Sequence, residues 1–304
     1  MTQLLNALPG ALAQGLIWGV MAIGVYITYK VLDIADLTVD GSICTGAAVC
    51  TMLLLGGQSP WLALLCAVLA GVLAGAVTGL LHVGLAIPPI LAGILTQMVL
   101  WSVNLKLLGK ANQALPARTT PVLLSQMDVG GALPVLLGFC VVLVALLVLF
   151  FGTELGCALR ATGCNPVMSR AQGVNTGLMK VVGLALSNGV VALSGALLCQ
   201  YQGYTDVNMG RGAVVIGLAA VVIGQAVLGR HGGHMAAQLG GVVLGAVIYY
   251  IVYQVIIFAG FDTDLLKMFS AVVVAVFLGV PHIRDQIRTN SRIKKGGSRH
   301  AENA

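Results

Sequence analysis

The sequence predicts an all-α polytopic membrane protein with about nine transmembrane helices and an inverted internal repeat. Three observations support this fold class. The 304 residues are 58% hydrophobic and only 9% charged, with a mean hydropathy of +0.98, a composition that excludes the ordinary soluble globular class. Apolar runs of roughly 20 residues, the length that a bilayer requires, recur along the chain. Finally, two parts of the chain match each other at a constant offset.

Nine apolar runs are interpreted as spans, with ends defined to within several residues. They cover residues 11–32, 39–56, 60–82, 87–103, 131–151, 180–199, 213–229, 236–258 and 265–281. Together they define a transmembrane domain over residues 1–282, followed by a basic tail over residues 283–304. Their order determines which loops share a side of the membrane.

The distribution of cations predicts the orientation. One side carries 11 of the 16 lysines and arginines, namely Lys30, Arg160, Arg170, Lys180, Arg230, Arg284, Arg288, Arg292, Lys294, Lys295 and Arg299. The other side carries five, namely Lys106, Lys110, Arg118, Arg211 and Lys267. Because cytoplasmic loops are enriched in lysine and arginine, we expect a cell-membrane protein with its N-terminus outside and its C-terminus in the cytoplasm. The basic tail is interpreted as a topology anchor on the lipid bilayer rather than a nucleic-acid site.

The internal repeat appears at an ungapped shift of 170 residues. This shift places GVMAIGV (19–25) on GVVALSG (189–195), and it places GVLAGAV (71–77) on GVVLGAV (241–247) with five of seven residues identical. Spans one to four then correspond to spans six to nine, with the fifth as a connector, and the odd separation makes the two halves face opposite sides. Inverted repeats are common in proteins that expose a pathway alternately to each side of a membrane.

Small residues at a spacing of four predict close helix packing. Gly71, Gly75 and Gly79 occupy one span, and Gly241 and Gly245 occupy its repeat partner. Such residues let the backbones of two helices approach closely. Within a bilayer this close packing matters because the hydrophobic effect does not drive helices together.

A polar break, DIADLTVDGS (33–42), lies between the first two spans and contains three aspartates. In one interpretation Asp40 or Thr38 caps the second span on the cytoplasmic side, with Gly41 and Ser42 loosening its first turn. In another the segment is unwound within the membrane and lines a pathway; in a third it contacts a partner. The repeat places Asp36 on Asp206, before a second glycine-rich break. The candidate pathway or gate residues are therefore Asp36, Thr38, Asp40, Ser42, Asp206 and Asn208.

The longest polar stretch on the predicted cytoplasmic side is GTELGCALRATGCNPVMSRAQGVNTG (152–177). Its composition predicts two short helices: Glu154 begins the first and Gly163 can end it, while Asn165 caps the second, Pro166 takes its first position and Gly173 stops it. This arrangement favours a docking element, and an ordinary solvated loop is the alternative.

The segment ALRATGCNPVMSRAQGVNTG resembles the signature of permease subunits of ABC importers of the branched-chain amino acid and ribose type. The matching positions are Leu159, Arg160, Ala161, Gly163, Asn165, Pro166, Arg170, Gly173 and Val174. DLTVDGS is similar to the family's DLSVGS, with Asp40 as an additional residue, and AVVIGQAVLGRHGG (220–233) is similar to its AVVLGG stretch, with Gly224-Gln225 in place of Gly-Gly. Residues 26–42 and 91–112 look most like a branch with members associated with tryptophan or tyrosine import.

The resemblance implies a fold, a function and partners. It implies a permease subunit that is itself not an enzyme. Its segment 152–177 is expected to supply the coupling helix that contacts an ABC ATP-binding subunit. Glu154 is included with the matching residues as a candidate for this coupling. The chain lacks the G-x-x-x-x-G-K-[ST] loop that holds nucleotide phosphates, so we expect Mg-ATP to be bound by that partner and no cofactor or metal by this chain. A solute-binding protein outside the cell and a second permease copy, as a homodimer, are also expected. Its cargo is expected to be a small solute, an amino acid or a related molecule.

An ion-coupled secondary transporter with inverted repeats is the alternative function. Such proteins commonly place ionisable residues in mid-membrane, and the sequence suggests none well inside a span. Gln97, Asn188, Gln225 and Gln254 are neutral and are interpreted as interhelical hydrogen-bonding groups rather than substrate ligands.

Overall fold

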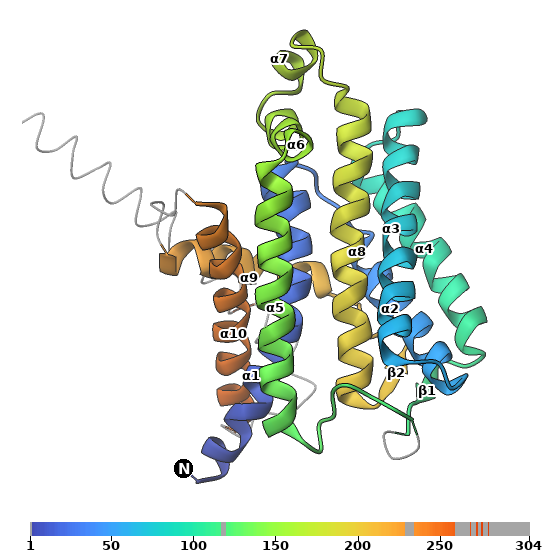
Figure 1. Cartoon of the computed structure of the whole chain (residues 1–304), viewed down its shortest axis with the longest axis vertical. Coiled ribbons are helices and arrows are strands. Elements are labelled where there is room, and N and C mark those ends of the chain that lie inside the picture. Colours follow the sequence, from blue (N-terminus) through green and yellow to red (C-terminus); the bar gives the residue numbers. More distant parts are fainter. Residues whose placement is uncertain are drawn as a thin grey trace, which may run out of the picture.

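The computed structural model describes residues 2–116, 120–228 and 234–258, together with the isolated positions 268, 272, 275 and 279. Within these residues the chain is a bundle of helices with one small sheet (Figure 1). The elements are α1 (Thr2–Tyr26), η1 (Ile27–Val31), α2 (Val39–Leu55), α3 (Pro60–Gly84), α4 (Pro89–Leu108), β1 (Asn112–Ala114), α5 (Val129–Gly152), α6 (Glu154–Cys164), α7 (Pro166–Ala171), α8 (Thr176–Gln202), β2 (Tyr204–Asp206), α9 (Ala213–Leu228) and α10 (Met235–Phe258).

Six of the described helices are long and apolar enough to cross a membrane. They are the segment Ala7–Val31 and helices α3, α4, α5, α8 and α10, while α2 and α9 are apolar but shorter. Each of the first eight predicted spans therefore coincides with a helix. The ninth, 265–281, and the basic tail lie outside the described residues, apart from the four isolated positions.

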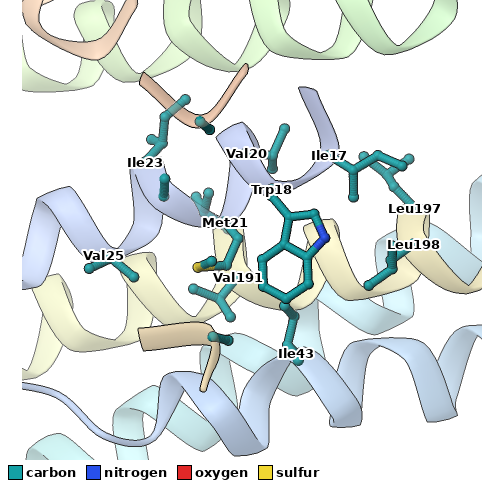
Figure 2. Packing of buried hydrophobic residues seen from close by; sticks show 14 of the residues in the cluster. Ile17, Trp18, Val20, Met21, Ile23, Val25, Ile43, Val191, Leu197 and Leu198 are labelled. Carbon is teal, nitrogen blue, oxygen red and sulfur yellow. The ribbon is translucent and has the colours of Figure 1, made fainter. Parts of the chain in front are cut away.

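Helices α1 and α8 form the centre of the bundle. Their most apolar windows are 83% and 72% buried, whereas those of α4 and α5 are each 28% buried. Helix α8 packs against α1, α2 and α3, and α1 packs against α5, α9 and α10. Figure 2 shows Trp18 and Met21 of α1 close to Val191 of α8 and Ile43 of α2. The outer helices carry most of the exposed leucine and valine, as expected for surfaces that face lipid.

Glycines allow α3 to lie close to α8, as the spacing predicts. A Cβ atom at Gly71 would stand 2.3 Å from the carbonyl oxygen of Asn188, and one at Gly75 would stand 2.2 Å from that of Leu184. In the second half a Cβ at Gly245 of α10 would stand 2.1 Å from the oxygen of Ala220 in α9. No side chain fits at these distances, so these glycines set the separation between the helices.

Two irregular segments interrupt the bundle. The end of α1 widens into the π-helical turn η1, after which residues 32–38 are non-helical and Asp33 has a φ of +55°. The second segment connects α8 to α9 and contains β2, which pairs antiparallel with β1 in the register Asn112 to Asp206. The sheet lies at the opposite end of the helices from α6 and α7 (Figure 1).

Candidate functional site

Asp36 lies at the centre of a buried polar network in the break between η1 and α2. Its side chain is 5% exposed. One carboxylate oxygen accepts a hydrogen bond from the Thr38 amide at 2.8 Å, and the other accepts one from Asn188 Nδ2 of α8 at 2.7 Å. Asn188 Oδ1 in turn accepts from the Ser42 hydroxyl at 2.6 Å. The Asp36 carboxylate therefore ties the non-helical segment to α8, and the Asn188 amide ties α8 to the first turn of α2.

Three threonines extend this network to α3 and α4. The Thr38 and Thr78 hydroxyls are 2.8 Å apart, and Thr78 donates to Thr96 at 3.0 Å. All three side chains are buried. In a low-dielectric interior a satisfied chain of hydrogen bonds is rigid, and an unpaired group is costly. The break is thus an ordered structure held by four helices.

The prediction that Asn188 makes interhelical hydrogen bonds is confirmed. Asp36 is an ionisable group that is buried in the bundle, although it lies in the break between two predicted spans and not inside a span. Thr78 and Thr96 were not predicted. The Thr96 hydroxyl donates to the Ala92 carbonyl four residues earlier in its own helix, and the single Thr78 hydroxyl proton is shared between Thr96 and the Ala74 carbonyl, which lies 3.2 Å away. A threonine satisfied in this way is compatible with any apolar helix, so its sequence context carries little signal. The position of Thr78 directly before Gly79, on the tightly packed face, was the available clue.

Asp40 does not cap its own helix. The N-cap of α2 is Thr38, whose side chain makes no capping hydrogen bond. The carboxylate of Asp40 instead accepts from the amides of Gly212 and Val214, each at 3.0 Å. These amides belong to the first turn of α9, where free N–H groups and the helix dipole favour a negative charge. The helix-cap interpretation of the break was therefore wrong for α2, because Asp40 caps a helix more than 170 residues away.

The second break approaches the first closely at this point. Gly210 lies against the backbone of Asp40, such that a Cβ atom there would be 2.1 Å from the Asp40 carbonyl oxygen. Asp206 is half-buried in β2, and one of its carboxylate oxygens accepts from the Asn208 amide at 2.6 Å. Asp36 makes the same turn with Thr38, two residues along the chain. Asp206 and Asn208 do not join the hydrogen-bonded network around Asp36.

The segment 152–177 forms the two short helices that its sequence predicts, α6 and α7. Asn165 Oδ1 accepts from the Met168 amide at 3.0 Å, which caps α7, and Pro166 occupies its first turn. Gly173 follows with a φ of +86°, a backbone conformation that glycine adopts most easily. At the start of α6 the capping side chain is Thr153, which accepts from the Gly156 amide at 3.3 Å.

Gly163 has a different role from the predicted one. Helix α6 continues through Gly163 to Cys164, and a Cβ atom at Gly163 would stand 1.8 Å from the carbonyl oxygen of Val31. The glycine therefore seats α6 against the end of η1. Leu159 is fully buried on the same helix. Through these two residues α6 is packed directly onto the break.

The outer surfaces of α6 and α7 are open. Val167 is 79% exposed and Met168 is 62% exposed, although both are apolar. Glu154, Arg160 and Arg170 are also exposed, and Arg170 donates to the Thr176 hydroxyl at 3.1 Å. The tip of the molecule, formed by α6 and α7 (Figure 1), thus carries two exposed apolar side chains and two exposed cations.

Comparison with known proteins gives one family. The family model "Branched-chain amino acid transport system / permease component" matches residues 8–281. The chain is 36% identical over 293 residues to a tyrosine transport system permease protein of Clostridioides difficile, covering 95% of this chain and 96% of that protein.

Two further relatives are more distant. The chain is 33% identical over 277 residues to an uncharacterized protein of Rickettsia prowazekii, covering 90% of this chain and 97% of that one. It is 29% identical over 216 residues to the autoinducer 2 import system permease protein LsrC of Escherichia coli, covering 67% of this chain and 60% of that one. No solved structure matches the chain.

Proposed function

Because the chain belongs to the permease family of the branched-chain amino acid transport systems, we propose that it carries an amino acid into the cell. It is a permease subunit of an ABC-type importer for small solutes, and not itself an enzyme. The observation that carries the amino acid proposal is the match over 95% of the chain to a relative described as a tyrosine transport system permease. The import of autoinducer 2 by a more distant relative makes a different small solute the competing cargo.

Energy enters, in this proposal, through α6 and α7. The ATP-binding subunit, which holds Mg-ATP, docks on the exposed tip formed by Val167, Met168, Arg160 and Arg170. The support is mechanical: Gly163 and Leu159 connect α6 to η1 and α8 with no intervening flexible segment. A displacement of the tip is therefore transmitted to the break beside Asp36. In this proposal the ATP-binding subunit hydrolyses ATP, and this chain contributes only the contact of α6 and α7 with that subunit.

The two halves of the bundle are related, we propose, as an inverted repeat with a pseudo-twofold axis between α1 and α8. Ser187 of α8 donates to the Gly24 carbonyl of α1 at 2.7 Å, and Ser194 donates to the Ile17 carbonyl at 2.7 Å. At the shift of 170 residues Ile17 corresponds to Ser187 and Gly24 to Ser194. Exchange of the halves therefore maps one contacting residue pair onto the other, although both hydroxyl donors belong to α8.

Helix packing supports the same relation. Helix α3 packs on α8 as α10 packs on α1, and α2 packs on α3 as α9 packs on α10. Gly19 of α1 lies against Val243 of α10, and its counterpart Gly189 lies against Val72 of α3. Two breaks that meet near the axis, at Asp40 and Gly210, are suited to opening first to one side of the membrane and then to the other. In this proposal Asp36, Thr38, Asp40, Ser42, Asp206 and Asn208 form the gate region.

The proposed assembly follows from the two ends of the molecule. The end with α6 and α7 faces the cytoplasm, which leaves the N-terminus outside and the C-terminus inside. The end with β1 and β2 faces a solute-binding protein. Each ATP-binding subunit of a dimer needs one docking tip, so two copies of this chain form the permease.

Reconstitution tests the function. The purified chain is placed in proteoliposomes with the ATP-binding subunit and the solute-binding protein encoded beside it, and accumulation of radiolabelled L-tyrosine is measured. We expect accumulation that requires ATP and the ATP-binding subunit. Accumulation that persists without that subunit and collapses with an ionophore would instead identify an ion-coupled transporter, for which the buried Asp36 is the observation in favour.

The docking tip is tested by charge reversal. Arg160→Glu with Arg170→Glu is expected to lower ATP turnover of the complex at least tenfold, which corresponds to about 1.4 kcal/mol of lost binding or activation free energy. The matched control is Lys106→Glu with Lys110→Glu at the other end of the molecule, which should leave turnover unchanged when both variants are measured without the solute-binding protein. Normal complex formation and turnover in the first variant would remove α6 and α7 from the coupling role.

A further inference from the structure

A cavity of about 460 Å³ opens beside the break, between α2, α4 and the turn that precedes α9. Its walls include Asp40 of α2, Met98 and Trp101 of α4, and Arg211 of the turn. It also reaches Asn104 near the end of α4 that leads to the sheet. The volume lies within the range of small-molecule sites, about 300–1,000 Å³.

Asn104 carries the clearest sign of a missing partner. Its side chain is 1% exposed, and neither Oδ1 nor Nδ2 has a hydrogen-bond partner. In the described ranges no other buried side-chain nitrogen or oxygen is in this state. A carboxamide can donate two hydrogen bonds and accept two, and buried polar groups are nearly always satisfied. Because Asn104 is one of the residues that line the cavity, an occupant that reaches its buried amide can supply the missing partner.

The cavity also carries one charge of each sign. The Asp40 carboxylate already accepts two backbone amides of α9, but each oxygen of a carboxylate has a further lone pair available for an ammonium group. Arg211 is exposed on the same cavity wall, one residue before the first of those amides. A guanidinium group presents paired donors that match the geometry of a carboxylate. The wall is therefore complementary to a molecule with a separated ammonium and carboxylate.

The rest of the lining mixes apolar and polar residues: Met98, Trp101, Ile94 and Val207 are apolar, whereas Gln97 and Ser102 are polar. Met98 is 65% exposed and Trp101 is 44% exposed. An indole ring and a thioether offer flat, polarisable surfaces on which apolar or aromatic side chains pack well.

We propose that this cavity is the transit site for the zwitterion of an α-amino acid with an apolar or aromatic side chain. Arg211 faces the carboxylate of the amino acid, and Asp40 faces its ammonium group. The Asn104 amide forms a hydrogen bond with one of these two groups. Trp101 and Met98 contact its side chain. The proposal rests on the proposed transport function and adds the location and chemistry of the site. It also gives a reason for Asp40 to bridge α2 and α9. A ligand bound to Asp40 then contacts a residue that is connected to both irregular segments.

Asn104→Leu is the informative variant because it separates a structural role from a ligand-binding role. Replacing an unpaired buried amide by an apolar side chain of similar size should leave the fold equally or more stable. If the amide binds the amino acid, transport should fall all the same. Val103→Ala, at the neighbouring position of α4 and outside the cavity lining, is the matched control.

Binding is measured on the full chain in lipid nanodiscs by saturation-transfer NMR, with L-tyrosine and L-leucine as probes. Tyramine lacks the carboxylate, and 3-(4-hydroxyphenyl)propionate lacks the ammonium group. We expect saturation transfer to both amino acids, at least a threefold weaker effect with either analogue, and at least a fivefold loss in Asn104→Leu at unchanged or higher thermal stability. The complete importer should show a similar loss of uptake, with Val103→Ala behaving as wild type.

The proposed site is overturned if tyrosine receives equal saturation transfer from Asn104→Leu and from wild type, or none from wild type. Either result counts even where ATP-driven uptake of tyrosine is normal. Equal transfer to tyramine and to tyrosine overturns the zwitterion. Absence of ATP-driven amino acid uptake overturns the proposed function instead, and the binding measurement then decides the site by itself.

Discussion

Exchanging Asp36 and Asn188 tests whether the polar network holds the break between α1 and α2. Asp36→Asn retains an acceptor for the Thr38 amide, but it turns the 2.7 Å bond to Asn188 Nδ2 into a contact between two donors. A hydrogen bond to a charged group contributes about 1.5–3 kcal/mol. Rotation of the Asn188 amide recovers part of this and gives up its bond to the Leu184 carbonyl. We expect a net destabilisation of about 1–2 kcal/mol.

Asn188→Asp alone should be worse. It places two carboxylates at hydrogen-bonding distance in a buried site, at an expected cost of about 3–5 kcal/mol. The combined exchange, Asp36→Asn with Asn188→Asp, restores one donor and one acceptor between the two positions, and the new carboxylate still accepts from the Ser42 hydroxyl. The double variant should therefore be more stable than Asn188→Asp, with a coupling of at least about 2 kcal/mol between the two changes.

The assay is unfolding of the purified variants in nanodiscs, followed by uptake in proteoliposomes. Asn175→Asp is the matched control, because Asn175 is an exposed cap of α8 where a carboxylate is equally suitable. Additive effects of the two changes, or wild-type stability in Asn188→Asp, would refute the account of the break as a structure held by Asp36.

Three further outcomes follow from the geometry. Gly75→Ala should destabilise the protein by about 1–3 kcal/mol, because the new methyl group meets the Leu184 carbonyl. The control Gly138→Ala, where a Cβ atom would have no neighbouring atom within 4 Å, should be neutral or stabilising by up to about 1 kcal/mol. Equal unfolding temperatures of the two variants would contradict the packing argument. Asp40→Asn should remove an acceptor from one α9 amide and speed hydrogen exchange in the first turn of α9, and unchanged exchange there would show that the cap is dispensable. Asp206→Asn keeps the turn to the Asn208 amide and is expected to lower uptake at unchanged expression and stability; wild-type uptake would reduce Asp206 to a turn-forming residue.

Local features of the fold were accessible from the sequence because their causes are local. Asn165 and Pro166 define the start of α7 through contacts within four residues, and the glycine spacing of α3 reports a face that only small residues can occupy. The apolar runs are long because the bilayer is thick, so the helices of the first eight predicted spans were located without any knowledge of their packing, and six of them are long enough to cross a membrane.

The site depends on contacts that no local pattern encodes. Asp40 bonds to α9 across 172 and 174 residues of sequence, and a carboxylate near a helix start is more commonly the cap of that helix. Gly163 looked like a helix stop because glycine ends helices often, but the carbonyl of Val31 occupies the place of its side chain. Asn104 could not be recognised at all, because an unpaired amide is defined by what surrounds it in three dimensions.

The contact between Asp40 and Gly210 bears on how the two halves diverged. In the proposed repeat of 170 residues these two positions correspond, and a Cβ atom at Gly210 would overlap the backbone carbonyl of Asp40. Glycine at position 210 lets the two segments approach closely enough for the Asp40 carboxylate to reach the amides at the start of α9. The proposed repeat therefore connects the difference between DLTVDGS and DVNMGRG at this position to a close contact in which only one of the two segments carries a side chain.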